Sequence, residues 1–147
     1  MKEYQKLIDI IEKYIRLSPE KSVVKFLKIR LTDFVHEGKV HRVFVSTRSL
    51  KHVYDKRPAE EFDRCVLTIN EILDKPLEIY DNTSKEGKRG SILLSYSDKH
   101  KQKYLCVLEK EDMGNNYNVV TFFRLRKENY LKSYKLIWSQ EDGEPLS

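Results

Sequence analysis

A histidine within STRSLKHVYDKRP, residues 46–58, is the residue of this sequence best suited to acid–base chemistry. Histidine has an unperturbed pKa near ~6.5, so its side chain can take up and release a proton near neutral pH. If the segment is helical, Leu50, Val53 and Tyr54 form an apolar side and His52 lies roughly opposite to it. We therefore expect His52 to be exposed and available for proton transfer at a phosphodiester.

Cationic side chains surround this histidine along the same segment. Arg48 shares its side of the expected helix, Lys51 flanks that side, and Arg57 follows at the helix end. Cations beside a histidine attract phosphate, so these three residues are candidate phosphate-binding residues. The alternative is a solvated helix face without a binding role, which is the more common origin of such a charged side.

A second candidate element is YNVVTFFRL, residues 117–125, whose two alternating faces are both largely apolar. This pattern predicts a central strand. Thr121 could then donate a hydrogen bond to a phosphate oxygen, and Arg124 and Arg126 could stabilise transition-state charge. Strict alternation places Thr121 and Arg124 on opposite faces, so both serve one site only if a bulge or the strand end redirects one of them. An ordinary strand residue and a solvated strand end remain the alternatives.

The overall charge suits a polyanionic partner, and the alternative is an ordinary basic protein that binds no nucleic acid. The 147 residues include 28 Lys and Arg against 23 Asp and Glu, a formal net charge of +5. This length suits one domain, and the chain has neither an apolar run long enough for a membrane span nor a cysteine-rich scaffold. We expect a cytoplasmic protein without a membrane partner, in which Cys65 and Cys106 are reduced, packed thiols.

A basic loop and several aromatic residues would serve nucleic-acid binding, and they would equally suit an ordinary basic protein. DNTSKEGKRG, residues 81–90, holds two glycines and no apolar side chain, which predicts a mobile loop. Its Lys88 and Arg89 are candidate phosphate- or RNA-binding residues. Aromatic side chains elsewhere are able to stack on bases, namely Tyr54, Tyr96 and Tyr104.

Metal and cofactor sites are not expected. The sequence contains no HExxH, EF-hand, GxGxxG, GxxxxGK[ST] or GxSxG motif, and its four histidines and two cysteines are scattered. His36, His41 and His100 are expected to be exposed loop residues. We predict neither a metal nor a cofactor.

The first forty residues carry helical signals. Apolar residues recur at helical spacing over 2–17, and Ser18-Pro19 resembles the capped start of a second helix. That helix would bury a stripe from Val23 to Phe34, reach about Glu37 and end at Gly38. Residues 1–40 are therefore expected to form a helical hairpin.

The rest of the chain combines helices with a run of strands. We expect helices over 48–57, capped by Ser46 or Thr47 and ended by Pro58, and from Phe62 to near Pro76. Strands are expected at 43–45, 77–80, 91–97, 103–109 and 117–125, the last three as an antiparallel meander, with an edge strand at 134–138.

These elements define one α+β domain, with N-terminal helices packed on an antiparallel sheet of about four or five strands. Its expected parts are the hairpin of residues 1–40, an α+β core over 41–140 and a flexible tail over 141–147.

The order of several segments over about residues 43–138 resembles the phage-associated branch of the Barnase, EndoU, colicin E5/D and RelE-like nuclease superfamily. The segments are VFVSTRSLKHVYDKRP, NEILDKPLEIYDN, SILLSYS, KYLCVLE and NVVTFFRLRKENY. In this comparison His52 matches a histidine used as acid or base, and Thr121 matches a polar strand position near the phosphate. Many relatives have a second histidine where this chain has Arg57-Pro58.

The resemblance implies a metal-independent, toxin-like endoribonuclease in which the RNA 2′-hydroxyl attacks the adjacent phosphodiester. Its expected partners are RNA and a cognate inhibitor or antitoxin protein. The missing second histidine favours the alternative, a catalytically inactive RNA-binding or protein-interaction module that serves a phage or mobile element as an accessory protein.

Overall fold

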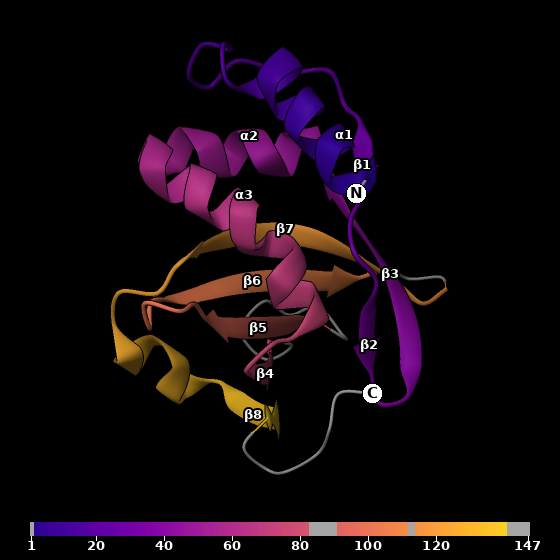
Figure 1. Ribbon diagram of the computed structural model, residues 1–147, viewed down its shortest axis with the longest axis vertical. Coiled ribbons are helices and arrows are strands. Elements are labelled where there is room, and N and C mark those ends of the chain that lie inside the picture. The colour runs from indigo at the N-terminus through magenta and orange to yellow at the C-terminus, as the bar shows by residue number, and fades with distance from the viewer. Residues whose placement is uncertain (1, 83–90, 112–113, 141–147) are drawn as a thin grey trace.

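The computed structural model describes residues 2–82, 91–111 and 114–140 (Figure 1). Its helical elements are α1 (Lys2–Ile10), the π-helical turn η1 (Ile11–Ile15), α2 (Thr47–Lys56), α3 (Ala59–Asp74) and the 3₁₀ helix η2 (Glu128–Ser133). Its strands are β1 (Lys28–Arg30), β2 (Phe34–His36), β3 (Lys39–Ser46), β4 (Glu78–Asp81), β5 (Ile92–Ser97), β6 (Lys103–Lys110), β7 (Asn116–Arg124) and β8 (Lys135–Ser139). Most of the predicted loop, with Lys88 and Arg89, and the predicted tail over 141–147 lie outside the described residues.

The strands form one sheet in the order β1-β3-β7-β6-β5-β4-β8, and β2 pairs with β3 beside this path. The α+β class is confirmed, but the sheet has eight strands among the described residues, so the predicted four or five is an undercount. The predicted meander of β5, β6 and β7 is present with antiparallel pairing. As predicted, β7 is internal and β8 lies at an edge.

The predicted second helix of the N-terminal hairpin is wrong. Residues 23–27 are irregular, and the chain then enters β1 and β2, which both pair antiparallel with β3. Leu31 and Phe34 of the expected stripe are buried, whereas Val23 is 91% exposed. Helical spacing in this segment coexists with β-forming residues, and pairing with β3 decides between the two structures. Gly38 marks the β2–β3 turn instead of a helix end, because Glu37 and Gly38 both have positive φ angles, as a tight hairpin turn requires.

Local signals did place the two helices that follow. The Ser46 hydroxyl caps α2 by accepting a hydrogen bond from the Ser49 N–H at 3.1 Å, and α2 ends before Arg57-Pro58. The apolar stripe of α3 is buried against the sheet, with Phe62, Ile69 and Ile72 at most 1% exposed.

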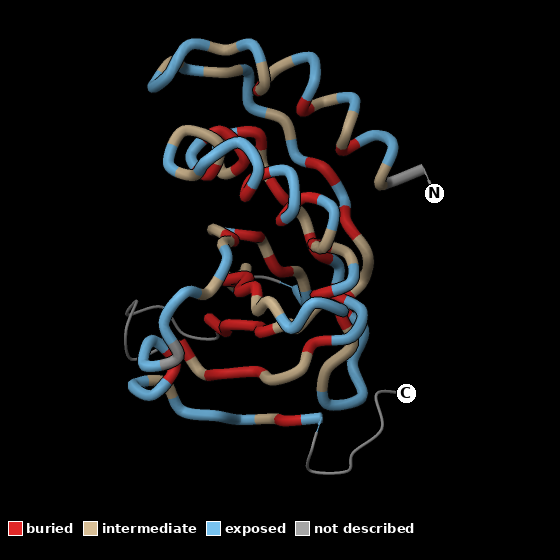
Figure 2. The backbone as a smooth tube through the Cα atoms, turned by 60° about the vertical axis from the view of Figure 1, so that its left-hand side comes forward, coloured by how far each residue is buried: buried red, intermediate tan, exposed pale blue. Residues whose placement is uncertain are grey.

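The two faces of the sheet carry separate apolar clusters. The larger cluster packs α1, α2 and α3 against one face, and Figure 2 shows buried residues on the inward side of the helices. On the other face, Leu131 of η2 packs with Leu93, Leu105 and Val107. The sheet is therefore covered by helices on one face and, over part of the other, by η2.

Buried polar groups also differ from the sequence expectation. His41 is 5% exposed within β3, and its Nδ1 lies 3.0 Å from the Asn115 carbonyl oxygen. His36 is half-buried in β2, where burial lowers its pKa. The expectation of exposed loop histidines is thus wrong for both residues. Cys65 and Cys106 are buried free thiols, and burial raises the pKa of Cys65 to about 12.

Candidate active site

A groove forms where the pairing of β3 with β7 ends. The two strands pair in parallel along Arg42–Val45 and Asn116–Val119. Strand β3 then gives way to α2 at Thr47, whereas β7 continues to Arg124. The C-terminal half of α2 therefore lies beside the later part of β7, and a groove of about 670 Å³ separates them.

The groove is cationic. Five of its lining side chains are lysine or arginine, and none of the described residues that line it is acidic. The cations come from α2 and from the end of β7: Lys56, Arg57, Arg124, Arg126 and Lys127. His52, which is exposed, lines the same groove. The surface thus combines a histidine with positive charge, as binding and cleavage of a phosphodiester would require.

The structure brings together five of the nine residues that the sequence predicted for the site. His52, Thr121 and Arg124, the predicted catalytic residues, all line the groove, as do Arg57 and Arg126. Arg48 and Lys51 line a neighbouring hollow of about 630 Å³ instead, together with Val23 and Val24. Lys88 and Arg89 lie outside the described residues.

A β-bulge shapes the strand side of the groove. Val107 of β6 faces Thr121, but the next residue, Leu108, faces Val119, which leaves Val120 without an opposite partner. Thr121 still lies on the η2 face and Arg124 on the helix-covered face, because their partners Val107 and Tyr104 belong to different clusters. Both reach one groove because it runs along the edge of the strand.

Glu61 is a site residue that the sequence interpretation missed. Its side chain is 4% exposed, one carboxylate oxygen pairs with Arg126, and the other lies 3.7 Å from Nε of Arg57. The same oxygen accepts a hydrogen bond from the Arg124 N–H at 3.4 Å. A buried carboxylate needs such compensation, and it in turn fixes the two guanidinium groups at the groove. The sequence feature that pointed to this contact was the spacing of four residues between Arg57 and Glu61, which is typical of ion pairs on a helix.

Arg57 is held from a second direction by an aromatic ring. Its guanidinium carbon lies 4.9 Å from the centroid of the Phe123 ring, which is cation–π distance. Arg57 is therefore fixed between Glu61 and Phe123. This predicted phosphate-binding residue has a defined position at the groove.

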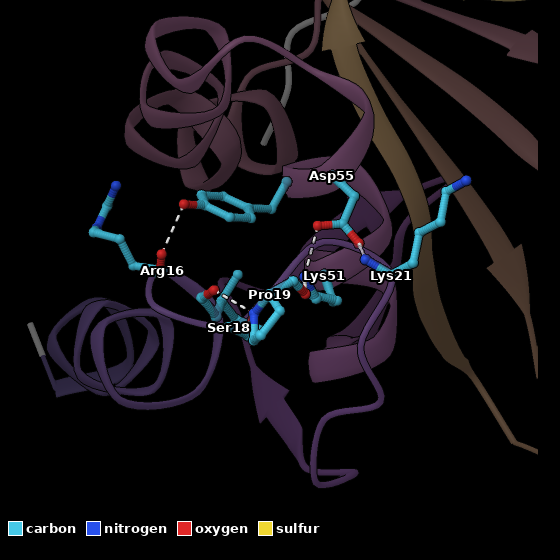
Figure 3. Close-up of polar contacts among 8 residues, drawn as sticks. Arg16, Ser18, Pro19, Lys21, Lys51 and Asp55 are labelled. Atoms are coloured by element: carbon cyan, nitrogen blue, oxygen red, sulfur yellow. Dashed lines mark hydrogen bonds and ion pairs between the residues drawn. The ribbon is translucent and has the colours of Figure 1, made fainter.

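Lys51 does not have the exposed, flanking position expected for it. It is 5% exposed, and its Nζ donates to the Asp55 carboxylate at 2.6 Å and to the Pro19 carbonyl at 2.7 Å (Figure 3). Asp55 also accepts the Lys21 N–H at 3.0 Å. Residues 16–21, here called the N-terminal segment, lie over this side of α2. Lys51 therefore binds another part of the same chain. Holding phosphate, as predicted for it, would compete with these contacts.

The same contacts fix the charge state of Asp55 and the position of α2. Burial on its own raises the pKa of Asp55, but the hydrogen bonds from Lys51 and Lys21 and the charges of Lys51 and His52 outweigh it, so the pKa is lowered. The Tyr54 hydroxyl donates to the Arg16 carbonyl at 2.8 Å (Figure 3). These bonds tie the helix that carries His52 to the N-terminal segment.

The aromatic residues predicted to stack on bases are engaged elsewhere. Tyr104 is 2% exposed, Tyr96 donates a hydrogen bond to Glu71, and the Tyr54 ring packs edge-on against Phe62. The aromatic residue that lines the groove with an exposed side chain is Tyr130 of η2. Its position shortly after the cations of RLRK, residues 124–127, was the sequence feature that pointed to a place beside the groove.

A second hollow, of about 580 Å³, adjoins Arg124 and Arg126 on the side of α3. Glu60, Glu61 and Asp98 line it along with His100. This mixed charge is less suited to a polyphosphate chain than the cationic groove is. The groove is therefore the better candidate for a nucleic-acid site.

Neither a metal-binding cluster nor a membrane-spanning helix is found in the described part of the chain. No group of three or more His, Cys, Asp or Glu side chains that could hold a metal ion occurs among them. Within the same residues, no helix has the length and apolar character needed to cross a membrane.

The chain belongs to a family of nuclease-like proteins. The family model described as phage-Barnase-EndoU-ColicinE5/D-RelE like nuclease2 matches residues 23–139. This confirms the resemblance seen in the sequence, and the match also takes in β1 and β2. No curated protein and no solved structure matches the chain.

Proposed function

We propose that the protein is a metal-independent, toxin-like endoribonuclease that cleaves RNA through attack of the 2′-hydroxyl on the adjacent phosphodiester. The observation that carries the proposal is the groove between α2 and β7, where His52 lies among five cations and no described lining residue is acidic. RNA binds such surfaces through its phosphates. The family supplies the expectation of nuclease chemistry.

In the proposed reaction the 2′-oxygen forms a bond to phosphorus and the bond from phosphorus to the 5′-oxygen breaks. The products are a 2′,3′-cyclic phosphate and a 5′-hydroxyl. His52 either removes the 2′-hydroxyl proton as a base or protonates the leaving 5′-oxygen as an acid. Thr121 donates a hydrogen bond to a phosphate oxygen, and Arg124 stabilises the charge that develops there, with Arg57 and Arg126 holding phosphate.

Arg57 takes the place of the second histidine of many relatives. A guanidinium stays protonated in proteins, so Arg57 can stabilise negative charge but cannot act as acid or base. We assign one of the two proton transfers to His52 and the other to a water molecule. The metal-independent character of the reaction rests on the family resemblance.

The decisive test is product analysis on a defined RNA. We expect a 2′,3′-cyclic phosphate, no cleavage of the matching DNA, full activity in EDTA, and loss of activity in His52→Ala. The matched control is His100→Ala, which changes an exposed histidine that does not line the groove. Cleavage of the DNA, or activity that vanishes in EDTA and returns with magnesium, would contradict the proposal.

A second candidate function is supported by Arg57 at the place of the second histidine. The chain would then be an inactive RNA-binding or protein-interaction module on the same scaffold. RNA binding without cleavage, together with growth that is equal on expression of wild type and His52→Ala, would favour this alternative. A toxin would slow growth unless His52 is replaced. If the protein is such a toxin, we propose that it is cytoplasmic and that a cognate inhibitor protein restrains it.

A further inference from the structure

Three aromatic side chains contact one another at the groove, and two of them, Phe123 and Tyr130, line it. Tyr130 lines the groove and is 40% exposed. Its ring lies 5.6 Å from Phe123 in an edge-on contact and 5.5 Å from Tyr134 in a tilted contact. The hydroxyl oxygens of Tyr134 and Tyr130 are 3.3 Å apart. Neighbouring rings therefore hold the Tyr130 ring while part of it faces the groove.

The backbone that carries this ring is also anchored. Tyr130 belongs to η2, where its N–H donates to the Lys127 carbonyl at 3.0 Å. The next residue, Leu131, is 6% exposed and packs in the apolar cluster on that face of the sheet. The ring is therefore presented by a packed turn, which lowers the entropy cost of binding.

The aromatic rings adjoin the cations of the groove. The Arg57 guanidinium stacks over Phe123, and the same Phe123 ring contacts Tyr130. A phosphate held by Arg57 would thus lie one aromatic ring away from the exposed part of Tyr130. Protein surfaces that bind single-stranded nucleic acids combine these two features, since cations hold the backbone while aromatic rings stack on the bases.

We propose that Tyr130 is the stacking site for one unpaired RNA base next to the phosphate held in the groove. The inference rests on the proposed function and specifies its substrate class. A base inside a duplex has both faces covered by its neighbours and cannot stack on Tyr130. The substrate is therefore a single-stranded segment, such as a loop or an RNA end.

The test is a double-mutant cycle between the protein and the RNA. Once the wild-type cleavage site is mapped on a single-stranded RNA, an abasic nucleotide is placed at each flanking position in turn. We expect Tyr130→Ala and Tyr130→Leu to lower kcat/KM about tenfold on the intact RNA, within the range that base–aromatic stacking supports, whereas Tyr130→Phe stays near wild type. At one flanking position, the abasic RNA should lower wild-type activity by a similar factor and leave Tyr130→Ala unaffected.

The control variant is Phe26→Ala. Phe26 is also a half-exposed aromatic residue beside an arginine, with the Arg48 guanidinium carbon 5.1 Å from its ring, but it does not line the groove. Its removal should leave kcat/KM unchanged. Thermal midpoints of all variants separate a loss of stacking from a loss of folding.

The outcomes distinguish the two proposals. Equal losses for Tyr130→Ala on intact and on every abasic RNA, or full activity of Tyr130→Leu, would overturn the stacking site and leave the ribonuclease proposal standing. If wild type binds RNA without cleaving it, the abasic nucleotide is placed at each position of the bound RNA in turn, the cycle is measured on affinity, and the same criteria apply. RNA that is neither cleaved nor bound would overturn both.

Discussion

At the scale of single residues, His52 and Glu61 have different relations to the groove. His52 is exposed at its surface, whereas the Glu61 carboxylate is buried beneath it between Arg57 and Arg126. An exposed residue can contribute to chemistry with little effect on folding. Removing a buried charge affects both catalysis and folding, because its charged partners then lack an opposite charge.

Replacement of His52 by alanine should lower cleavage by roughly a hundredfold or more, the lower part of the ~10²–10⁴ that positioned acid–base groups contribute. The free energy of unfolding should change by less than about 0.5 kcal/mol, because surface substitutions rarely do more. Cleavage rate and thermal midpoint are measured on the same preparation. Unchanged cleavage by a folded variant would show that His52 does not transfer the proton.

Replacement of Glu61 by glutamine keeps the size of the side chain and removes its charge. We expect kcat/KM to fall about tenfold, because Arg57 and Arg126 lose the group that holds them at the groove. The unfolding free energy should fall by about 1–3 kcal/mol, as expected for weakened charge-assisted hydrogen bonds. Glu61→Asp should recover part of the activity, and a Glu61→Gln variant with wild-type kcat/KM would show that Glu61 does not position the arginines.

At the scale of elements, α2 depends on the N-terminal segment that lies over it. Lys51 and Asp55 form a largely buried ion pair with side chains 6% and 15% exposed, and each also bonds to the backbone of that segment. This arrangement links the stability of the segment to the position of the helix that carries His52. The link is electrostatic, so it responds to pH.

Asp55→Asn should destabilise the protein by about 1.5–3 kcal/mol at neutral pH, as expected for the loss of hydrogen bonds to a charged group. Because the pKa of Asp55 is lowered on folding, its contribution is complete above the unfolded value near ~3.9 and is lost as the pH falls through the folded value. The difference between variant and wild type should therefore shrink below about pH 4. Urea unfolding at pH 7 and in acid measures it.

Asp33→Asn is the matched control for this experiment. Asp33 pairs with Arg30 at 3.1 Å, but the two side chains are 39% and 46% exposed. Exposed pairs contribute at most about 1 kcal/mol, so this variant should change stability little at either pH. A pH-independent effect of Asp55→Asn would show that the Asp55 charge does not stabilise the segment.

At the scale of the whole molecule, a net charge of +5 is combined with a groove in which cations gather. RNA affinity should fall steeply with salt, by about 0.7 logarithmic units per tenfold change in salt for each phosphate contact with a single strand. Arg126→Ala should reduce that slope by about the value of one contact. Titrations by fluorescence anisotropy at several salt concentrations measure it.

Lys88→Ala and Arg89→Ala extend this titration to the loop that the sequence predicts to contact RNA. Each should weaken binding modestly and reduce the slope. An affinity that does not depend on salt would point instead to a protein or a small molecule as the partner.

The sequence by itself determined the elements whose signals are local. A cap at Ser46 or Thr47 and the stop at Pro58 predicted α2, the apolar period predicted α3, and alternation with short polar turns predicted the meander of β5, β6 and β7. The wheel of α2 also placed His52 on the exposed side. These predictions succeeded because capping, periodicity and turn formation depend on residues close together in the chain.

Tertiary structure decided what depends on distant partners. Residues 28–30 became a strand because β3 offered them a hydrogen-bonding edge, and Lys51 became buried because the N-terminal segment lies over it. The parallel pairing of β3 with β7, the contacts of Glu61 with Arg126, and the place of Tyr130 in the groove likewise join residues far apart in the chain. Periodicity describes one segment at a time, whereas these features arise only when two segments meet.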